Sequence, residues 1–367
     1  MSDLARLETP CLVVDRAKVE ANAARLKKHL DRLGVPLRLH VKTPKSPPAI
    51  DFVLGGAKAP ITVSTLKEAE QFFDAGYRDI LYAAGFTPAK LERARTLAAR
   101  GAKLTVITDN LEAARAISGL PVLIEIDTDG DRAGLSPDAP ALLAVAKALR
   151  ENGCTVAGVM THAGASYECR SPDALRAMAE KERAGAVHAA RRLREAGFEA
   201  PVVSVGSTPT AHFAERLDGV TEVRAGVYVF FDLVMAGIGV CRPEDIALSV
   251  LTTVNGHRAD RGWTLVDAGW MALSRDRGTA KQPVDQGYGV VCDVEGRILP
   301  DLVVQATHQE HGIIAHRNGG KVPHLPVGTR LRILPNHACA TGAQHAGYHV
   351  VQHRTAVSAC WERFSGW

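Results

Sequence analysis

Two polar segments near opposite ends of the chain carry residue types suited to cofactor and metal chemistry. His337 and Cys339 stand two positions apart, directly after the apolar run 331–334. Lys42 ends another short apolar run, 37–41. A thiolate and an imidazole suit a soft divalent metal, and a lysine amine can hold a carbonyl cofactor as a Schiff base. If the fold brings them together, the site pairs an electron sink with a Lewis acid.

The first 230 residues predict an alternation of strands and helices. Short apolar runs of the kind that form buried strands occur at 37–41, 61–64, 79–82, 103–107, 121–126, 155–160, 202–205 and 221–223. Helical stretches are expected over 16–33, 66–75, 89–99 and 174–196. Eight parallel strands with crossover helices describe an α/β fold of the (β/α)8, TIM-like barrel type. A doubly wound sheet is the alternative, because alternation alone does not establish closure.

From about residue 248 the pattern changes to short strands with few helices. Apolar runs at 248–254, 263–267, 289–294 and 329–334 are separated by glycines and polar turns. This spacing predicts a C-terminal, mainly antiparallel β domain. We expect a barrel domain over 16–240 and a β domain, formed by 1–15 and 241–367, that carries the pair His337 and Cys339.

Composition and charge exclude several classes of protein. The net charge of +4 is spread along 367 residues without a block of like charges, which argues against binding to nucleic acid or a membrane surface. No apolar run approaches the roughly 18 residues of a membrane span. Seven scattered cysteines without a CxxC pair do not form a disulfide framework. With no signal peptide at the start, a cytoplasmic location is expected.

The loops after the seventh and eighth strands predict a phosphate site. Chemistry in such barrels occurs at the carboxyl ends of the strands, and phosphate usually binds after these two. The candidate residues are Gly206, Ser207, Thr208, Gly226, Val227 and Tyr228. Glycine lets backbone N–H groups approach an anion, and hydroxyls add donors. One such loop is more often a plain turn, but two in this order favour phosphate binding.

A lysine in the same barrel mouth indicates pyridoxal phosphate as the cofactor. Lys42 is preferred to Lys45 because it directly follows the strand, whereas Lys45 lies beyond Pro44. Arg132, after the fifth strand, is a further candidate for contact with the cofactor.

Two aromatic side chains follow the sixth strand. His162 and Tyr167 either line the cofactor or simply close a loop.

Four residues of the β domain are candidates for contact with the substrate. Arg275 and Arg277 belong to a polar loop that either faces solvent or supplies guanidinium groups for a second carboxylate. Gln309 and His311 belong to a polar cluster without an assignable ligand geometry.

The pair His337 and Cys339 is a weak metal motif on spacing alone. On an extended segment, residues two apart point the same way, so both side chains would face one metal. Two ligands would leave positions open for water and substrate. Ligand softness favours zinc, with manganese or magnesium as alternatives. A buried His and Cys without any metal is the competing interpretation.

Taken together, the motifs resemble those of one pyridoxal-phosphate family of fold-type III. This family joins D-serine dehydratase, D-threonine aldolase and D-threo-3-hydroxyaspartate dehydratase. The resemblance extends from about residue 8 to residue 367. It is carried by HVKT at 40–43, VSTLKEAE at 63–70, EIDTDG at 125–130, VGSTPT at 205–210, QEHG at 309–312 and HACAT at 337–341.

The resemblance implies an architecture and a set of roles. Family members have an alanine-racemase-like barrel, a C-terminal β domain and a head-to-tail homodimer. Lys42 would be the Schiff-base lysine, with His337 and Cys339 as metal ligands. Segments 226–232 and 266–277 look closest to the hydroxyaspartate dehydratase branch. Aldolase members usually carry an acidic residue where Cys339 stands, which favours a dehydratase.

The implied reaction is metal-assisted removal of water from a small D-3-hydroxy amino acid substrate. D-threo-3-hydroxyaspartate would give oxaloacetate and ammonia, and D-serine is a second substrate candidate. The alternative is retro-aldol cleavage of the D-threonine aldolase type, which gives glycine and an aldehyde. A racemase would not need His337 and Cys339, and a pyridoxal-phosphate carrier would stop after the barrel.

Overall fold

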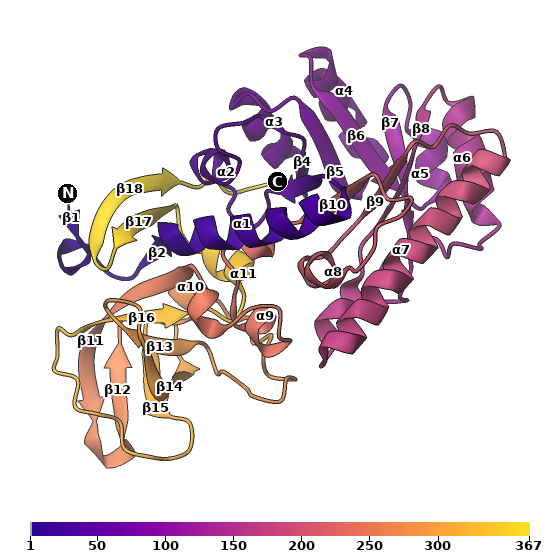
Figure 1. Ribbon diagram of the computed structural model, residues 1–367. Coiled ribbons are helices and arrows are strands. Elements are labelled where there is room, and N and C mark those ends of the chain that lie inside the picture. The colour runs from indigo at the N-terminus through magenta and orange to yellow at the C-terminus, as the bar shows by residue number, and fades with distance from the viewer. Residues whose placement is uncertain (1) are drawn as a thin grey trace. The chain divides into compact units, whose positions relative to one another are not determined.

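The computed structural model describes residues 2–367, which form two compact units. The barrel unit consists of residues 25–42, 54–226 and 366–367. The β unit consists of the chain up to residue 24, residues 43–53 and residues 227–365. In Figure 1 the strands of the barrel unit run from indigo to rose, and most strands of the β unit are orange to yellow.

Eight parallel strands close into the barrel. They are β3 (Leu37–His40), β4 (Ile61–Val63), β5 (Asp79–Gly85), β6 (Lys103–Thr108), β7 (Pro121–Ile126), β8 (Thr155–Thr161), β9 (Val202–Val205) and β10 (Glu222–Ala225). Each pairs with the next along the chain, and β10 returns to pair with β3 through the register Val223 with Leu37. All eight predicted strands are therefore confirmed, and closure excludes the doubly wound sheet.

Helices follow most of these strands, as predicted. Helix α1 (Arg16–Leu33) precedes β3. The helices that follow strands include α3 (Leu66–Asp74), α4 (Leu91–Ala99), α5 (Leu111–Ala116), α6 (Ala141–Glu151), α7 (Pro172–Glu195) and α8 (Thr208–Phe213). In α7, Ser171 caps the N-terminus by accepting the N–H of Ala174, and Pro172 occupies the first turn. Within residues 2–367, no helix is both long and apolar enough to cross a bilayer.

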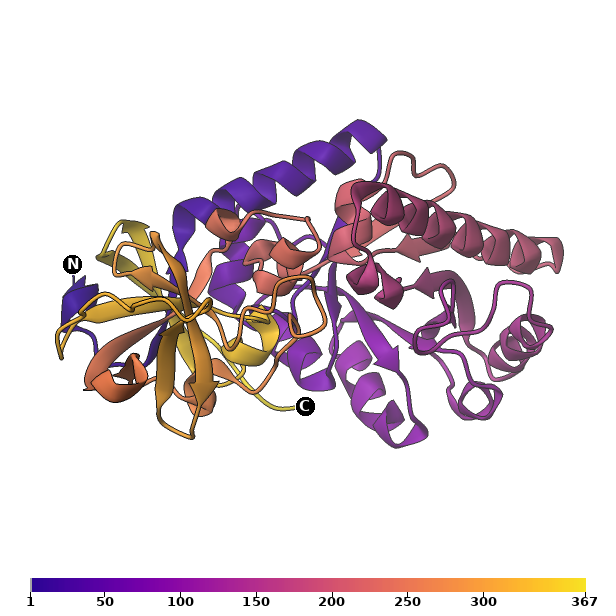
Figure 2. The same cartoon turned by 90° about the horizontal axis from the view of Figure 1, so that it is seen from below.

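The β unit is built on one ten-stranded sheet, whose orange and yellow strands are seen together in Figure 2. In spatial order the strands are β1 (Ser2–Asp3), β18 (Ala356–Glu362), β17 (Gly347–His353), β2 (Cys11–Asp15), β11 (Leu248–Arg258), β12 (Trp263–Val266), β15 (Gly312–His316), β14 (Ile298–Thr307), β13 (Val290–Asp293) and β16 (Arg330–Leu334). A further pairing of β16 with β11 closes the last six strands into a ring. The described pairs are antiparallel apart from β2 with β17, which confirms the predicted β domain.

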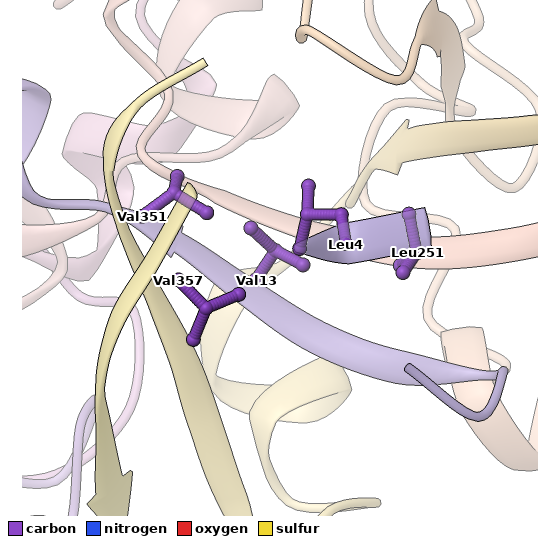
Figure 3. Packing of buried hydrophobic residues seen from close by; sticks show 5 residues of the cluster. All are labelled: Leu4, Val13, Leu251, Val351 and Val357. Carbon is purple, nitrogen blue, oxygen red and sulfur yellow. The ribbon is translucent and has the colours of Figure 1, made fainter. Parts of the chain in front are cut away.

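Apolar packing ties the two ends of the chain to this sheet (Figure 3). Val13 of β2, Leu251 of β11, Val351 of β17 and Val357 of β18 form one buried cluster with Leu4. Burying a side chain of this size contributes roughly 1.5–3 kcal/mol. Sequence-distant strands therefore form one stable scaffold, from which the elements around His337 project. Those include α9 (Leu233–Gly237), α10 (Trp270–Leu273) and α11 (Ala338–Gly342), while α2 (Pro47–Val53) lies against β18.

Candidate active site

Lys42 is the second residue after β3, in a turn, and it is exposed. The N–H of Lys42 donates to His40 Nδ1 at 3.4 Å. Burial, and then the charge of Lys42, lowers the pKa of His40 well below its usual range and that of His162 to about 3. The amine therefore lies within electrostatic reach of two imidazoles that stay neutral at physiological pH.

His162 and Tyr167 follow β8 and lie together. Their ring centroids are 6.3 Å apart, with planes tilted by 49°. His162 Nδ1 lies 3.1 Å from the carbonyl oxygen of Gly206. Because a neutral imidazole meets a carbonyl through its N–H, Nδ1 carries the proton and Nε2 keeps its lone pair. His162 thus presents an acceptor nitrogen beside the loop after β9.

The two glycines predicted at the phosphate loops are required by neighbouring backbone. Gly206 has a φ of 133°, and a Cβ there would lie 2.1 Å from the carbonyl oxygen of Arg224. A Cβ on Gly226 would lie 2.6 Å from the carbonyl oxygen of His40. Real Cβ atoms do not come that close, so only glycine fits either position. The loops after β9 and β10 can therefore lie directly against adjacent strands.

Buried hydroxyls gather at the start of α8. Ser207 caps this helix, with its Oγ accepting the N–H of Thr210, and both Ser207 and Thr208 are buried. Ser207 Oγ also lies 3.0 Å from Thr210 Oγ1 and 3.0 Å from Ser166 Oγ. Hydroxyl donors beside a helix start fit a phosphate group, so this part of the barrel unit suits pyridoxal phosphate.

Three other residues predicted at the cofactor have different environments. Arg132 is exposed, and its guanidinium lies 3.9 Å from the carboxylate of Glu125. Val227 and Tyr228 belong to the β unit, in a short 3-10 turn after β10. Tyr228 is fully buried, and burial raises the pKa of its hydroxyl. These side chains are placed by the fold, but their contact with a cofactor remains a prediction.

A polar layer inside the barrel was missed by sequence reasoning. The buried guanidinium of Arg224 donates to Ser204 Oγ at 2.7 Å and to the carbonyl oxygen of Thr161. Glu222, two residues earlier on β10, accepts from Arg38 Nε at 2.7 Å. The available signal was a charged residue at alternate positions of strands that should be apolar on both faces.

The metal-ligand candidates lie at the junction of β16 and α11. His337 is extended, but α11 begins at Ala338, so Cys339 lies in a helical turn. The predicted extended segment is thus wrong at Cys339, because Asp232 accepts the N–H of Ala338 at 2.9 Å and starts the helix there. The two side chains nevertheless interact, since Cys339 contributes to the pKa of His337. Cys339 Sγ also lies 3.2 Å from Thr43 Oγ1.

Asp276 orients His337, and sequence reasoning missed it. Its Oδ2 lies 2.7 Å from His337 Nδ1. Burial opposes protonation of His337, but the bonds to Asp276 and Cys339 raise its pKa to about 11. A carboxylate on one imidazole nitrogen, which leaves the other for a metal, is the usual setting of a metal-binding histidine. Among residues 2–367 no group of three His, Cys, Asp or Glu side chains that could hold a metal is found. The role of His337 and Cys339 as metal ligands stays a prediction.

The two arginines proposed for a substrate carboxylate differ in their partners. Arg275 is exposed and stacks on the ring of Trp270, with its guanidinium carbon 4.4 Å from the ring centroid. Arg277 donates to Asp285 at 2.5 Å and lies over the ring of Tyr288. The charge of Arg277 is therefore compensated, whereas no ion pair of Arg275 is found in the described part of the chain.

Gln309 and His311 lie in the exposed turn between β14 and β15. The carbonyl oxygen of Gln309 accepts the N–H of Met271 at 3.2 Å, which fixes this turn against the start of α10. Backbone contacts thus position the turn, and no ligand can be assigned to its polar side chains.

Comparison with known proteins decides the family. The alanine racemase N-terminal domain matches residues 14–234, and the putative serine dehydratase domain matches residues 247–351. D-threo-3-hydroxyaspartate dehydratase from Delftia sp. is 55% identical, with 99% of each chain covered. Its solved structure superposes with a TM-score of 0.97 at 54% identity, over 100% of both chains. The chain belongs to the fold-type III pyridoxal-phosphate family of D-serine dehydratase and D-threonine aldolase.

More distant members of this family include both activities. D-serine dehydratase from Dictyostelium discoideum is 30% identical over 97% of this chain and 96% of its own. D-threonine aldolase from Arthrobacter sp. is 31% identical over 98% of this chain and 93% of its own. Family membership confirms the expected barrel with its β domain and supports pyridoxal phosphate as the cofactor.

Proposed function

We propose that this chain is a dehydratase, dependent on pyridoxal phosphate and a divalent metal, that converts D-threo-3-hydroxyaspartate to oxaloacetate and ammonia. D-serine is a second substrate. The observation that carries the proposal is the 55% identity to the Delftia dehydratase across both full chains. The D-serine dehydratase and aldolase relatives share 30% and 31%.

Lys42 would hold the cofactor through its amine. When bound, pyridoxal phosphate supplies an electron sink for the charge left at the α-carbon. The amine of Lys42 would also serve as the base that accepts the α-proton of the substrate. The neutral imidazole of His162 adds no competing positive charge beside this amine. The residues proposed to contact the cofactor are Arg132, His162, Tyr167, Gly206, Ser207, Thr208, Gly226, Val227 and Tyr228.

His337 and Cys339 would bind the metal, zinc by ligand softness and manganese or magnesium otherwise. A metal there supplies a Lewis acid that turns the β-hydroxyl into a better leaving group. One support is the orientation of His337 by Asp276. The other is a structure of the related dehydratase in which a cysteine is replaced by alanine, in the metal-free form. A histidine two positions earlier is replaced in a further structure, which matches the spacing here.

Arg275 is the better candidate for the second carboxylate of 3-hydroxyaspartate. Stacking on Trp270 holds its guanidinium in place while leaving the N–H groups available for a bidentate contact. Arg277 already pairs with Asp285. Gln309 and His311 are further candidates for polar contact with the substrate.

Retro-aldol cleavage is the second candidate function. The Arthrobacter aldolase covers nearly the whole chain, and the same lysine and metal would serve that reaction. The cysteine at position 339 favours water removal, because aldolases of the family usually carry an acidic residue there.

Three further assignments belong to the same proposal. The cofactor-binding barrel domain spans 16–240, and the β domain spans 1–15 and 241–367. The protein acts as a homodimer. It works in the cytoplasm.

A substrate panel tests the function. Holoenzyme is incubated with D-threo-3-hydroxyaspartate, D-serine and D-threonine, with and without EDTA, and ammonia, oxo acids and glycine are assayed. We expect ammonia with oxaloacetate or pyruvate, lost on metal removal and restored by zinc. Glycine with an aldehyde would assign the aldolase reaction, and full activity after verified metal removal would exclude the metal.

A further inference from the structure

Glu182 is a buried carboxylate in the middle of α7, with a relative exposure of 2%. Its Oε1 accepts two backbone hydrogen bonds, from the N–H of Ala163 and from the N–H of Gly206, each at 3.0 Å. Ala163 follows β8 and Gly206 follows β9. One carboxylate therefore joins the ends of two barrel strands.

The same carboxylate belongs to a chain of buried hydroxyls. Thr210 hydrogen-bonds Glu182 through its side chain. Thr210 Oγ1 in turn accepts the N–H of Ser207 at 3.1 Å and lies 3.0 Å from its Oγ. Ser207 Oγ continues to Ser166 Oγ at 3.0 Å. Glu182 is thus connected through Thr210 to Ser207, one of the residues assigned to the cofactor phosphate.

Both backbone polar groups of Gly206, its N–H and its carbonyl oxygen, have side-chain partners. Glu182 takes its N–H, and His162 Nδ1 binds its carbonyl oxygen at 3.1 Å. The N–H of Gly206 is therefore not available to a phosphate, whereas the hydroxyls of Ser207 and Thr208 are candidate donors in the same loop. The direction of these hydroxyls depends on the backbone conformation at Gly206.

Burying a carboxylate is costly unless its hydrogen bonds are satisfied. Burial raises the pKa of Glu182, and the bonds from Thr210 and the two amides oppose that rise. Removing the carboxyl would strand two buried N–H groups, and the loops would have to move to satisfy them.

We propose that Glu182 is a positioning residue for the cofactor phosphate, holding the loops after β8 and β9 so that the hydroxyls of Ser207 and Thr208 are set before the cofactor arrives. The inference rests on the proposed phosphate site. Loss of Glu182 should lower the affinity for pyridoxal phosphate but not for pyridoxal, because pyridoxal lacks the phosphate that this loop would bind.

Binding to the full-length apoenzyme, followed by absorbance, tests this role. For Glu182→Ala we expect the affinity for pyridoxal phosphate to fall about tenfold or more, with pyridoxal affinity changed less than about twofold. Glu182→Gln keeps an acceptor oxygen and should restore most of the preference for the phosphorylated form. Thr210→Val removes the hydroxyl that links Glu182 to Ser207 and carries the same test should the alanine variant not fold.

Two variants of the same helix serve as controls. Glu180 is on the surface of α7 and pairs with Arg183 and Arg216, so Glu180→Ala should keep the full preference. Leu193 is buried in α7, and Leu193→Ala should lower stability without changing the preference.

Three results would overturn the inference. The first is an unchanged preference for pyridoxal phosphate over pyridoxal in Glu182→Ala and Thr210→Val. The second is an equal loss of affinity for both ligands in these variants, as expected for a purely structural role. A wild-type enzyme that binds both ligands equally would remove the phosphate site itself, and with it the role of Glu182.

Discussion

The carboxylate of Asp276 lies 2.7 Å from Nδ1 of His337, so Nε2 is the nitrogen left for a metal. Asp276 is itself held by its loop. Its N–H donates to Ser274 Oγ at 3.2 Å, and its Oδ1 accepts the N–H of Gly278 at 2.8 Å. Ser274 has a φ of 71°, a conformation that non-glycine residues adopt only where the surroundings impose it. The loop is built to present this carboxylate.

Removing the Asp276 carboxylate should weaken metal binding. Loss of a carboxylate behind a metal-binding histidine costs about 10–100-fold in affinity, and we expect that range for Asp276→Ala in competition with a chelator. Cofactor absorbance should be retained. Asp260 is exposed and pairs with Arg258, so Asp260→Ala is the matched control. Unchanged metal affinity in Asp276→Ala would refute the orienting role.

His337 gives the metal-free protein a pH-dependent stability of defined sign. Burial lowers the pKa of His337, but Asp276 and Cys339 raise it overall from 6.5 to about 11. Because the folded state binds this proton more tightly, the contribution to the free energy of unfolding is complete below pH 6.5 and is lost as pH rises towards 11. The Tm difference between metal-free wild type and His337→Gln should therefore shrink above neutrality. It should also fall in strong acid, where Asp276, whose pKa is lowered by His337, becomes protonated. A difference that grows with pH above neutrality would contradict this.

Arg275 should determine preference for the dicarboxylic substrate. Loss of a charge-assisted hydrogen bond costs about 1.5–3 kcal/mol, so Arg275→Ala should raise KM for 3-hydroxyaspartate about tenfold or more. D-serine has no second carboxylate, and its KM should change little. Arg277→Ala is the control, because that guanidinium already pairs with Asp285. Equal losses for both substrates in Arg275→Ala would remove the assignment.

Gly206 should tolerate no side chain. A Cβ there would lie 2.1 Å from the carbonyl oxygen of Arg224, on a residue with a φ of 133°. Strain and overpacking of this kind cost about 2–5 kcal/mol together, and Gly206→Ala should lower the free energy of unfolding by that amount in urea. Gly85→Ala is the control, since nothing lies within 4 Å of the added Cβ. Equal stability of the two variants would be inconsistent with the packing of this loop.

Local patterns were enough to predict the scaffold. Most barrel strands are short apolar runs, although β3 and β10 carry charged residues at alternate positions. Lys42 stands out because it follows the apolar run 37–41. The burial of Glu182 was not predicted, although the sequence carried a signal for it. Glu182 falls at helical spacing between Ala179 and Ala186, which are both buried in α7.

The supports of the metal pair could not be predicted. Asp276 reaches His337 across 61 positions, and no local spacing encodes such a contact. The helix at Ala338 depends on a hydrogen bond to Asp232, 106 positions earlier. Spacing alone therefore suggested an extended segment.

The partition of D-threo-3-hydroxyaspartate between removal of water and retro-aldol cleavage is the most direct test of the proposed function. Holoenzyme with zinc is given D-threo-3-hydroxyaspartate, and oxaloacetate, ammonia, glycine and glyoxylate are quantified together. We expect one oxaloacetate and one ammonia for each substrate molecule consumed, without glycine. Glycine and glyoxylate in equal amounts, as the main products, would contradict it.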